Sequence, residues 1–371
     1  MKMKRMLALI GMLVIVLIFT GCSKAAKTVD ATRYGVSPSN SGRQNSENLQ
    51  KLIDELSVSG GTVYIPAGVY EFAENGTQTI GSHCIKMRSN VSIIGDGENT
   101  VLKPVGVSHF GLDMFYFNDY LDTGEPIYLE NCCFEDFVID ASGTSCATYT
   151  SAGKGFMFNL FRNCHWRGVT VRNTDATGFG VDCPIDSSIS FCTAVGCGKA
   201  ATVEHGGASG FGIGYGYSAG ESMTITDCRA EENKKFGFFF EHQGRFNSAM
   251  YTSEEAAGFR VSNCTARGNL YNFGGIVAFS GVYEGCTSEW PVRAGCYFED
   301  CSDFEVKNCL FRQSMEYDIL IDGGSARMVL TGNRSDSNRI FLGMAADDCI
   351  NTGNSWNEEP DSIGWKLMPG V

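Results

Sequence analysis

The sequence predicts an all-β protein whose short strands coil into a parallel β-solenoid, with one short helix at the N-terminal end. Three observations predict this fold. Several cysteines follow an asparagine or aspartate at the end of a strand-like stretch, apolar segments return at a near-constant interval, and a single amphipathic helix precedes them. Together they indicate one long repetitive domain.

The composition narrows the class of protein. Of 371 residues, 43% are apolar and 19% charged, and 29 basic against 42 acidic residues give a net charge of −13. This apolar share excludes a disordered acidic protein. The negative charge argues against a nucleic-acid partner, which needs a basic surface. The 16 cysteines are many for a cytosolic enzyme but too dilute for a small disulfide scaffold.

The N-terminus resembles a secretion signal. Basic residues at 2, 4 and 5 precede an apolar run at 6–20, which is shorter than the roughly 20 residues of a membrane span. Phe-Thr-Gly-Cys at 19–22 resembles the bacterial lipobox, in which cleavage precedes the cysteine and its thiol takes a lipid. We expect a signal peptide at 1–21 and a tether at 22–32. The lipid on Cys22 would anchor an extracytoplasmic domain to the bacterial cell membrane. A plain N-terminal anchor helix is the alternative.

The first element after the tether is an amphipathic helix at 47–57. Leu49, Leu52, Ile53 and Leu56 lie on one helical face, and glycines at 60–61 end the helix before a strand at 62–70. A helix that covers the open end of a solenoid protects that edge from aggregation. We therefore expect this helix to cap the coil.

Two recurring segments define the coil. Alternation of apolar and polar residues, as at 223–228 and 259–264, indicates strands with one buried face. Each of these strands ends in Asn-Cys or Asp-Cys, where the first residue tolerates a left-handed turn. The second segment places its first inward residue at 156, 179, 211, 238, 276, 296, 319 and 340. The base interval of about 20–23 residues is typical of a β-solenoid, which we place at 33–350, with a tail or cap at 351–371.

The cysteines then have an architectural role. Inward side chains of one rung stack on those of the next, about 4.8 Å away. Small apolar side chains stack well in such an interior. We expect most cysteines to be stacked free thiols, and disulfides are the alternative.

A family resemblance adds the handedness. The string GGTVYIPAGVY at 60–70 and GDG at 95–97, within 32–72 and 89–104, resemble the opening of the pectate-lyase-like superfamily. This resemblance implies a single-stranded right-handed parallel β-helix over most of 32–350. The superfamily includes pectate lyases, polygalacturonases, rhamnogalacturonases, alginate epimerases and phage tailspikes, so the fold alone does not give the reaction.

The outward face of the second segment carries a row of candidate site residues. If Phe179 points inward, Asp182 points outward at the end of its strand. The equivalent positions on the aligned rungs are Asn159, Asp182, Gly214, Glu241, Phe279, Glu299 and Asp322. Asp182 and Glu241 are then two rungs apart, roughly 9–10 Å, with Gly214 between them. This arrangement predicts a trough for a sugar ring with a carboxylate on each wall, and a solvated ladder of acids is the alternative.

The longest steps of the repeat lie at 179–276 and bring further candidates to this region. His205 and His242 are candidate proton-transfer groups, and Arg245 could pair with a sugar carboxylate. The remaining candidates would bind substrate by stacking or charge: Tyr215, Tyr217, Phe239, Lys199, Lys235 and Glu299.

The segment at 173–195 resembles the catalytic stretch of alginate epimerases, with Asp182 in the position of their catalytic aspartate. That group has tyrosine, histidine and glutamate where this chain has Phe179, Pro184 and Ile185. The resemblance therefore extends to Asp182 alone.

Three functions follow, in order of preference. The first is a lyase or C5-epimerase acting on a uronate-containing, acidic polysaccharide, with His205, His242 or a tyrosine as base and Arg245 or Ca²⁺ as the partner of the sugar carboxylate. Asp182 and Glu241 are the candidate Ca²⁺ ligands, and the sequence indicates no other cofactor. The second is an inverting glycoside hydrolase of the polygalacturonase type, in which the same two carboxylates act as acid and base. The third is a glycan-binding or adhesive solenoid without catalysis.

Overall fold

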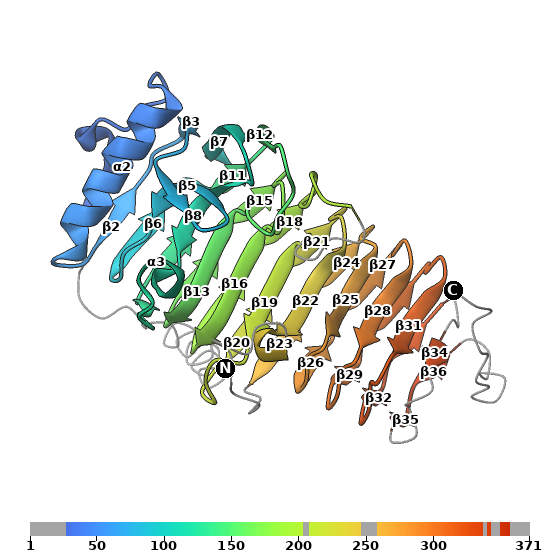
Figure 1. Cartoon of the computed structure of the whole chain (residues 1–371). Helices are drawn as coiled ribbons and strands as arrows, with labels where there is room; N and C mark the ends of the chain where they lie inside the picture. The colour runs from blue at the N-terminus through green and yellow to red at the C-terminus, as the bar shows by residue number, and fades with distance from the viewer. Residues whose placement is uncertain (1–26, 203–207, 246–257, 337–339, 343–348, 357–371) are drawn as a thin grey trace, which may run out of the picture.

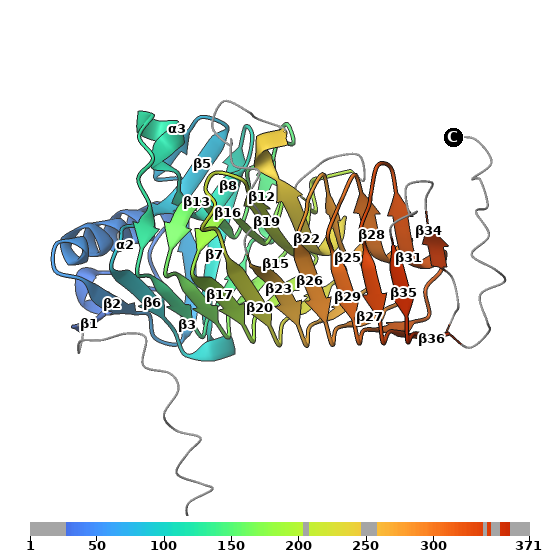
Figure 2. The same cartoon turned by 90° about the horizontal axis from the view of Figure 1, so that it is seen from below.

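In the computed structural model, the chain forms an elongated right-handed solenoid of three parallel sheets (Figure 1). The structure describes residues 27–202, 208–245, 258–336, 340–342 and 349–356. Figure 2 shows the rungs stacked along one axis from the N-terminal helix α2 to the last strands. The predicted β-helix with a capping helix is confirmed.

Each of the three sheets contains 12 strands. The first sheet has, in order, β1 (Thr28–Asp30), β2 (Gly61–Tyr64), β6 (Val91–Ile94), β10 (Cys133–Glu135), β14 (His165–Arg167), β17 (Ser187–Ser190), β20 (Met223–Thr226), β23 (Phe259–Ser262), β26 (Gly281–Glu284), β29 (Glu305–Lys307), β32 (Val329–Thr331) and β35 (Ile350–Thr352). The second has β12 (Gly143–Cys146), β7 (Thr100–Ser108), β11 (Val138–Asp140), β15 (Thr170–Arg172), β18 (Thr193–Val195), β21 (Arg229–Glu231), β24 (Thr265–Arg267), β27 (Thr287–Glu289), β30 (Leu310–Arg312), β33 (Arg334–Ser335) and β36 (Ser355–Trp356), with β3 (Gly68–Phe72) also beside β7.

The third sheet carries the candidate site. Its strands are β34 (Ile340–Leu342), β31 (Tyr317–Asp322), β28 (Ala294–Glu299), β25 (Tyr271–Ile276), β22 (Phe236–His242), β19 (Phe211–Tyr215), β16 (Phe179–Ile185), β13 (Phe156–Arg162), β8 (Leu112–Phe117), β5 (Gly81–Lys86) and β4 (Gly76–Gln78), with β9 (Leu129–Glu130) beside β13. Short helices complete the described chain: η1 (Ala31–Tyr34), α2 (Gly42–Ser57), η2 (Gly97–Asn99), α3 (Asp119–Thr123) and η3 (Gln243–Arg245).

Aromatic stacking fills the interior behind the third sheet. Phe179, Phe211 and Phe238 are register partners on β16, β19 and β22. Their ring centroids lie 4.7 Å and 4.8 Å apart with nearly parallel planes. This spacing is that of neighbouring strands, so the side-chain stack follows directly from the backbone register.

The turns between sheets use left-handed residues, as the sequence predicted, but at two corners rather than one. Asn131 and Asn163, with φ of 57° and 50°, end strands of the third sheet before the first sheet begins. Asp227 and Asn263, both with φ of 54°, lie between the first and second sheets. The side-chain amide of Asn163 also donates to that of Asn131 at 2.7 Å, which links neighbouring turns.

A ladder of buried cysteines follows the second of these corners. Its members are Cys192, Cys228, Cys264, Cys286 and Cys309, all free thiols. The backbone N–H of Cys192 donates to the sulfur of Cys228 at 3.4 Å, and that of Cys228 to Cys264 at 3.3 Å. Burial raises the pKa of the Cys228 thiol. The prediction of stacked free thiols is confirmed for these five residues.

Helix α2 caps the coil but begins five residues before the predicted start at 47. Ser41 is its N-cap, and its hydroxyl accepts a hydrogen bond from Gln44 N–H at 3.3 Å. Leu49, Leu52 and Ile53 are fully buried. Asn45, one turn earlier, is also fully buried because its side chain bonds Ser37 and Glu71. The extra turn is therefore held by polar contacts rather than by the apolar stripe.

The boundaries of the solenoid differ from the prediction at both ends. Strand β1 lies within the stretch predicted as a tether and pairs with β2. Strands β35 and β36 continue the coil into the stretch predicted as a tail or cap. The predicted signal peptide at 1–21 and Cys22 lie outside the described residues. In the described part of the chain, no helix is long and apolar enough to cross a membrane.

Candidate active site

The third sheet is hollowed where its outward residues are small. Gly180 on β16 and Gly212 and Gly214 on β19 point outward in successive register rows. A cavity of about 330 Å³ lies over them. Its lining residues are Tyr149, Ser151, Lys154, Met157, Thr177, Gly180, Asp182, Gly212, Phe239, Glu241 and Gln243. The predicted trough is therefore present on this face of the coil.

Two carboxylates face this cavity from alternate rungs. Asp182 is the register partner of Gly214, which is in turn the partner of Glu241. The backbone N–H of Gly214 donates to Asp182 Oδ1 at 2.9 Å. A Cβ atom on residue 214 would lie 2.3 Å from the same oxygen, so the position accepts only glycine without a rearrangement.

The side chain of Gln243 lies between the two carboxylates. It comes from η3, the turn that follows β22, and its Nε2 donates to Glu241 Oε1. The same Nε2 is 2.6 Å from the Cβ position of Gly214, next to Asp182. The amide therefore fixes Glu241 on the side of the cavity that faces Asp182.

Lys154 brings a cation to this site, and the sequence reasoning missed it. The side chain is only 8% exposed and lies across the floor, with Nζ 2.9 Å from the Cβ position of Gly180. Its backbone is held by Asp113, whose Oδ1 accepts N–H bonds from Gly153 at 2.7 Å and Lys154 at 2.6 Å. Inward–outward alternation carried upstream from Phe156 would assign Lys154 to the interior, so the periodicity of the sequence carries no signal for its place in the cavity.

Burial and charge shift the acidity of both carboxyl groups. Burial raises the pKa of Asp182, although the positive charge of Lys154 and the hydrogen bond from Gly214 N–H both act to lower it. The pKa of Glu241 rises to about 7, because of burial and then the negative charge of Asp182, while Lys154 and Gln243 oppose the rise. Glu241 therefore exchanges its proton near neutral pH, which suits an acid–base catalyst.

Two predicted site residues lie in the interior instead. Tyr215 is fully buried, and its hydroxyl donates to the backbone oxygen of Phe279 at 2.8 Å. His242 is 2% exposed, with its ring 5.3 Å from that of Tyr215 and 4.8 Å from that of Phe279. The same alternation that sends Asp182 and Glu241 outward sends these residues inward, so their assignment to the trough is wrong.

Three further predictions are corrected by the contacts. Tyr217 packs beside Tyr128, 6.5 Å between centroids, away from the lining residues. Lys199 is tied to a turn, because its Nζ contacts Asp175 at 2.9 Å and two backbone oxygens at 2.7 Å. Phe279 is not in the outward row, since Ile276 is the register partner of Glu241. The error was one of alignment, because the inward residue of that rung is Phe273 rather than Ile276.

The other predicted binding residues lie on the C-terminal side of the cavity. Phe239 lines the cavity as an aromatic wall, with its ring 4.5 Å from that of Phe236. Glu299 lies two rungs beyond Glu241 and accepts a hydrogen bond from Tyr297 at 2.9 Å. Burial lowers the pKa of Lys235, although the negative charges of Glu299 and Glu241 act to raise it. His205 and the side chain of Arg245 lie outside the described residues.

The donor set does not fit the predicted Ca²⁺ site. Calcium takes six to eight oxygen ligands, whereas Asp182 and Glu241 share their cavity with the ammonium of Lys154. In the part of the chain that the structure describes, no three His, Cys, Asp or Glu side chains are grouped to hold a metal ion.

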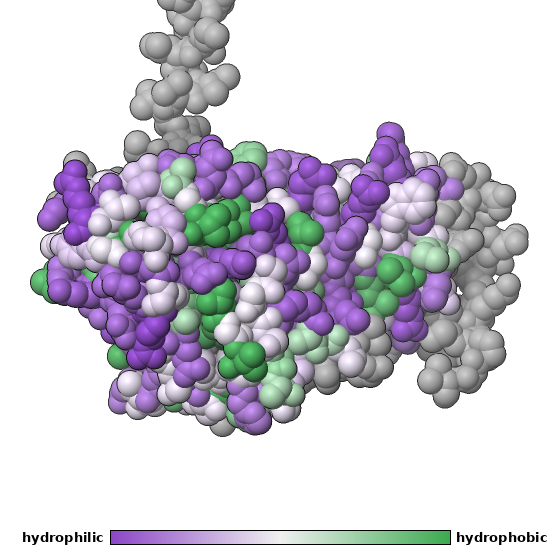
Figure 3. Space-filling model, turned by 90° about the horizontal axis from the view of Figure 1, so that it is seen from above, coloured by the Kyte–Doolittle hydropathy of each residue, from purple (hydrophilic) through white to green (hydrophobic). Residues whose placement is uncertain are grey.

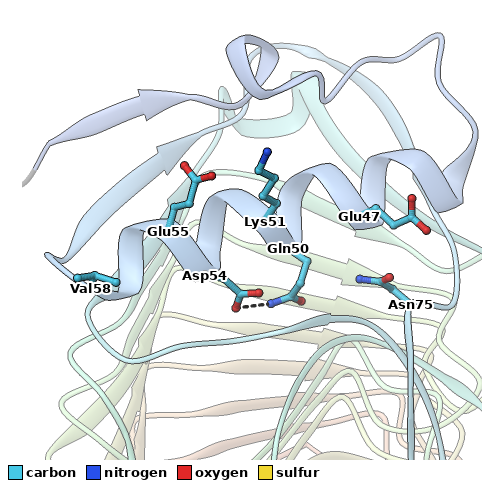
Figure 4. Close-up of a pocket in the computed structure, with 7 residues that line it drawn as sticks. All are labelled: Glu47, Gln50, Lys51, Asp54, Glu55, Val58 and Asn75. Atoms are coloured by element: carbon cyan, nitrogen blue, oxygen red, sulfur yellow. Dashed lines mark hydrogen bonds between the residues drawn. The ribbon is translucent and has the colours of Figure 1, made fainter.

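Another hollow lies along the outer side of α2, with a volume of about 610 Å³ (Figure 4). Figure 4 shows its polar lining, in which Gln50 donates to Asp54 at 3.1 Å. The surface seen in Figure 3 is largely hydrophilic, with small separate hydrophobic patches. Neither feature combines buried acids with a buried cation, so the cavity on the third sheet is the candidate active site.

The fold has relatives among solved structures. One is the A-module of the Azotobacter vinelandii mannuronan C-5 epimerase AlgE4, which matches at 18% identity and a TM-score of 0.63. The match covers 87% of this chain and 80% of the epimerase module. The tailspike protein of E. coli bacteriophage HK620, solved with a pentasaccharide, matches at 15% identity and a TM-score of 0.58, over 89% of this chain and 64% of the tailspike. At these identities the similarity shows the fold. No relative was found among curated protein sequences.

A family model described as a right-handed β-helix region matches residues 118–355. This match covers more than half of the chain, including every described lining residue of the cavity. The chain therefore belongs to the right-handed β-helix family.

Proposed function

We propose that the protein is a polysaccharide-modifying enzyme and that its cavity catalyses inverting hydrolysis of a glycosidic bond. The observation that carries this proposal is the pairing of Asp182 and Glu241 across Gly214, with the pKa of Glu241 raised to about 7. Two rungs correspond to roughly 9–10 Å between backbones. Inverting glycosidases hold their carboxyl groups about 6.5–9.5 Å apart to admit a water molecule.

In this mechanism Glu241 is the acid and Asp182 the base. Protonated Glu241 gives its proton to the glycosidic oxygen as the bond from that oxygen to the anomeric carbon breaks. A water molecule on the opposite face forms the new bond to the anomeric carbon and gives its proton to Asp182. Lys154 assists by keeping Asp182 ionised, because its ammonium opposes the effect of burial.

Lyase or C5-epimerase activity on a uronate is the second candidate. Lys154 favours it, because an ammonium in the cavity could pair with a sugar carboxylate and stabilise charge when the adjacent proton is removed. Tyr149 also lines the cavity, whereas His242 lies in the interior. The similarity to an epimerase module supports a glycan substrate for either reaction. Glycan binding without catalysis is the outcome if no sugar is altered.

A panel of polysaccharides separates these functions. New reducing ends without ultraviolet absorbance support hydrolysis, and absorbance from an unsaturated uronic end supports a lyase. Solvent deuterium entering the sugar, without chain cleavage, supports an epimerase. Asp182→Asn and Glu241→Gln should each lower kcat at least about 100-fold. Their Tm should change little at pH 5, where Glu241 is protonated. Full activity in both variants would refute the proposed site.

We also propose that the enzyme is held at the outer face of the bacterial membrane by a lipid on Cys22, which follows the apolar run at 6–20. Metabolic labelling with a radioactive fatty acid tests this anchor. The wild-type chain should be labelled and found in the membrane fraction. Cys22→Ala should lose both properties, and a labelled Cys22→Ala chain would contradict the assignment.

A further inference from the structure

We infer that the sugar unit bound between Asp182 and Glu241 carries no carboxylate, so that the substrate is a neutral glycan at the bond that is cut. This inference rests on the proposed hydrolysis at the same cavity. It narrows the substrate class and departs from the acidic polysaccharide that the sequence favoured.

The charges around the cavity are already unbalanced. Lys154 is the one cation among the described lining residues, and Asp182 and Glu241 are the two acids. A third carboxylate lies behind the floor, because Asp113 is fully buried and bonded to the backbone of Lys154. The charge of Lys154 acts on all three of these acids. The ammonium of Lys154 is therefore shared among three carboxyl groups before any substrate binds.

Two other lysines near the cavity are also engaged by acidic side chains. Lys199 is held by Asp175 at the turn between the second and third sheets. Lys235 lies between the charges of Glu241 and Glu299, which both act on its ammonium. With Glu241 protonated as the acid, a uronate would place a further carboxylate beside Asp182 and Asp113, whose charges the ammonium of Lys154 already offsets. An unpaired charge in a desolvated site is strongly unfavourable.

The uncharged part of the lining suits a neutral sugar ring. Met157 and Phe239 bound the glycine floor on two sides, and Tyr149, Ser151 and Thr177 bring hydroxyl groups to the same cavity. Apolar side chains pack on the C–H face of a sugar, and hydroxyl groups pair with its hydroxyls. None of these contacts requires a charge on the ligand.

Matched polymers test the inference. Polyuronates of several linkages, each beside the same polymer with its carboxyl groups reduced to hydroxymethyl groups, differ only in this charge. Neutral glucans, mannans and galactans complete the panel. Reducing-end assays give kcat/KM, and affinity electrophoresis of Asp182→Asn gives binding without turnover. We expect the reduced form to be preferred at least about tenfold in kcat/KM, the factor that roughly 1.4 kcal/mol of repulsion produces.

The variants give an internal check. Asp182→Asn removes one negative charge from the cavity, so the preference for the reduced polymer in binding should weaken relative to wild type. Glu135→Gln removes a charge from β10 in the first sheet, on another side of the coil, and should leave the preference unchanged. An equal effect of both substitutions would overturn the inference, because only the overall charge of the protein would then matter.

The possible outcomes distinguish this inference from the proposed hydrolysis. Faster cleavage or tighter binding of a polyuronate than of its reduced form overturns the inference, and ultraviolet absorbance with such a polymer would establish the second candidate function. Tighter binding of the reduced form without cleavage supports the inference while the hydrolase proposal fails. If no polymer of either kind binds, both proposals fail.

Discussion

Asp182 and Glu241 lie on either side of Gly214, whose backbone N–H donates to Asp182 at 2.9 Å and whose missing side chain leaves room for Gln243. A Cβ atom at this glycine would lie 2.3 Å from Asp182 Oδ1 and 2.6 Å from Gln243 Nε2. The relationship between the two acids therefore depends on a residue that carries no chemistry of its own.

We predict that Gly214→Ala separates this pair and lowers kcat/KM at least about tenfold, at a cost of roughly 1–3 kcal/mol in unfolding free energy. Steady-state kinetics and urea unfolding measure the two effects. Gly220→Ala is the matched control, because a Cβ there meets nothing within 4 Å. Wild-type kinetics in Gly214→Ala would show that the spacing of the acids does not matter.

A second prediction concerns the pH dependence of stability. The pKa of Glu241 rises from an ordinary value of 4.5 to about 7 in the folded protein. The folded state then binds the proton more tightly than the unfolded state. The contribution of Glu241 to the free energy of unfolding is therefore fully present below pH 4.5 and is lost as the pH rises through about 7. Glu241→Gln, which stays neutral, should gain stability relative to wild type by about 1–3 kcal/mol between pH 5 and pH 8. Urea unfolding at both pH values measures the change, and a constant difference would contradict the pKa shift.

A third prediction makes Asp113 a positioning residue for Lys154. Asp113→Ala removes the acceptor of the Gly153 and Lys154 N–H bonds and leaves these buried donors unpaired, which costs about 1–3 kcal/mol. Displacement of the Lys154 ammonium should raise the pKa of Asp182, so the acidic limb of the pH–kcat profile should move to higher pH. A purely structural role would lower stability without moving that limb.

The conservative variant separates the two roles of Asp113. Asp113→Asn keeps an oxygen that can accept the same N–H bonds, so we expect the pH profile to return toward wild type. The same shifted limb in both variants would show that the charge of Asp113, rather than its hydrogen bonds, sets the profile.

The sequence predicted the coil and the acid pair because both follow from simple alternation. Once Phe179, Phe211 and Phe238 are recognised as inward, Asp182 and Glu241 must be outward, and the register agrees. The same rule would have excluded Tyr215 and His242, which are also inward. They were included for their chemistry rather than for their position.

Contacts between distant segments could not be predicted in this way. Lys154 precedes β13 and owes its place to Asp113, 41 residues earlier in the chain. Gln243 follows β22 in a short turn whose direction no periodicity encodes. Residues that enter a site from turns depend on backbone hydrogen bonds across rungs, and these bonds appear only when the rungs are stacked.

The last prediction concerns the cysteine ladder. The sulfur of Cys264 lies 3.2 Å from the backbone oxygen of Ser262, and the neighbouring ladder residues Cys228 and Cys286 are also buried. Because burial raises the pKa of these thiols, they should not react with a thiol reagent in the native protein at pH 8. After unfolding in denaturant without a reductant, all five ladder thiols should react, as measured by mass spectrometry of the labelled peptides. Cys264→Ala should lower the unfolding free energy by about 1–2 kcal/mol, because it leaves a gap in the stack. Recovery of disulfide-linked peptides from the ladder would contradict the assignment of these residues as thiols.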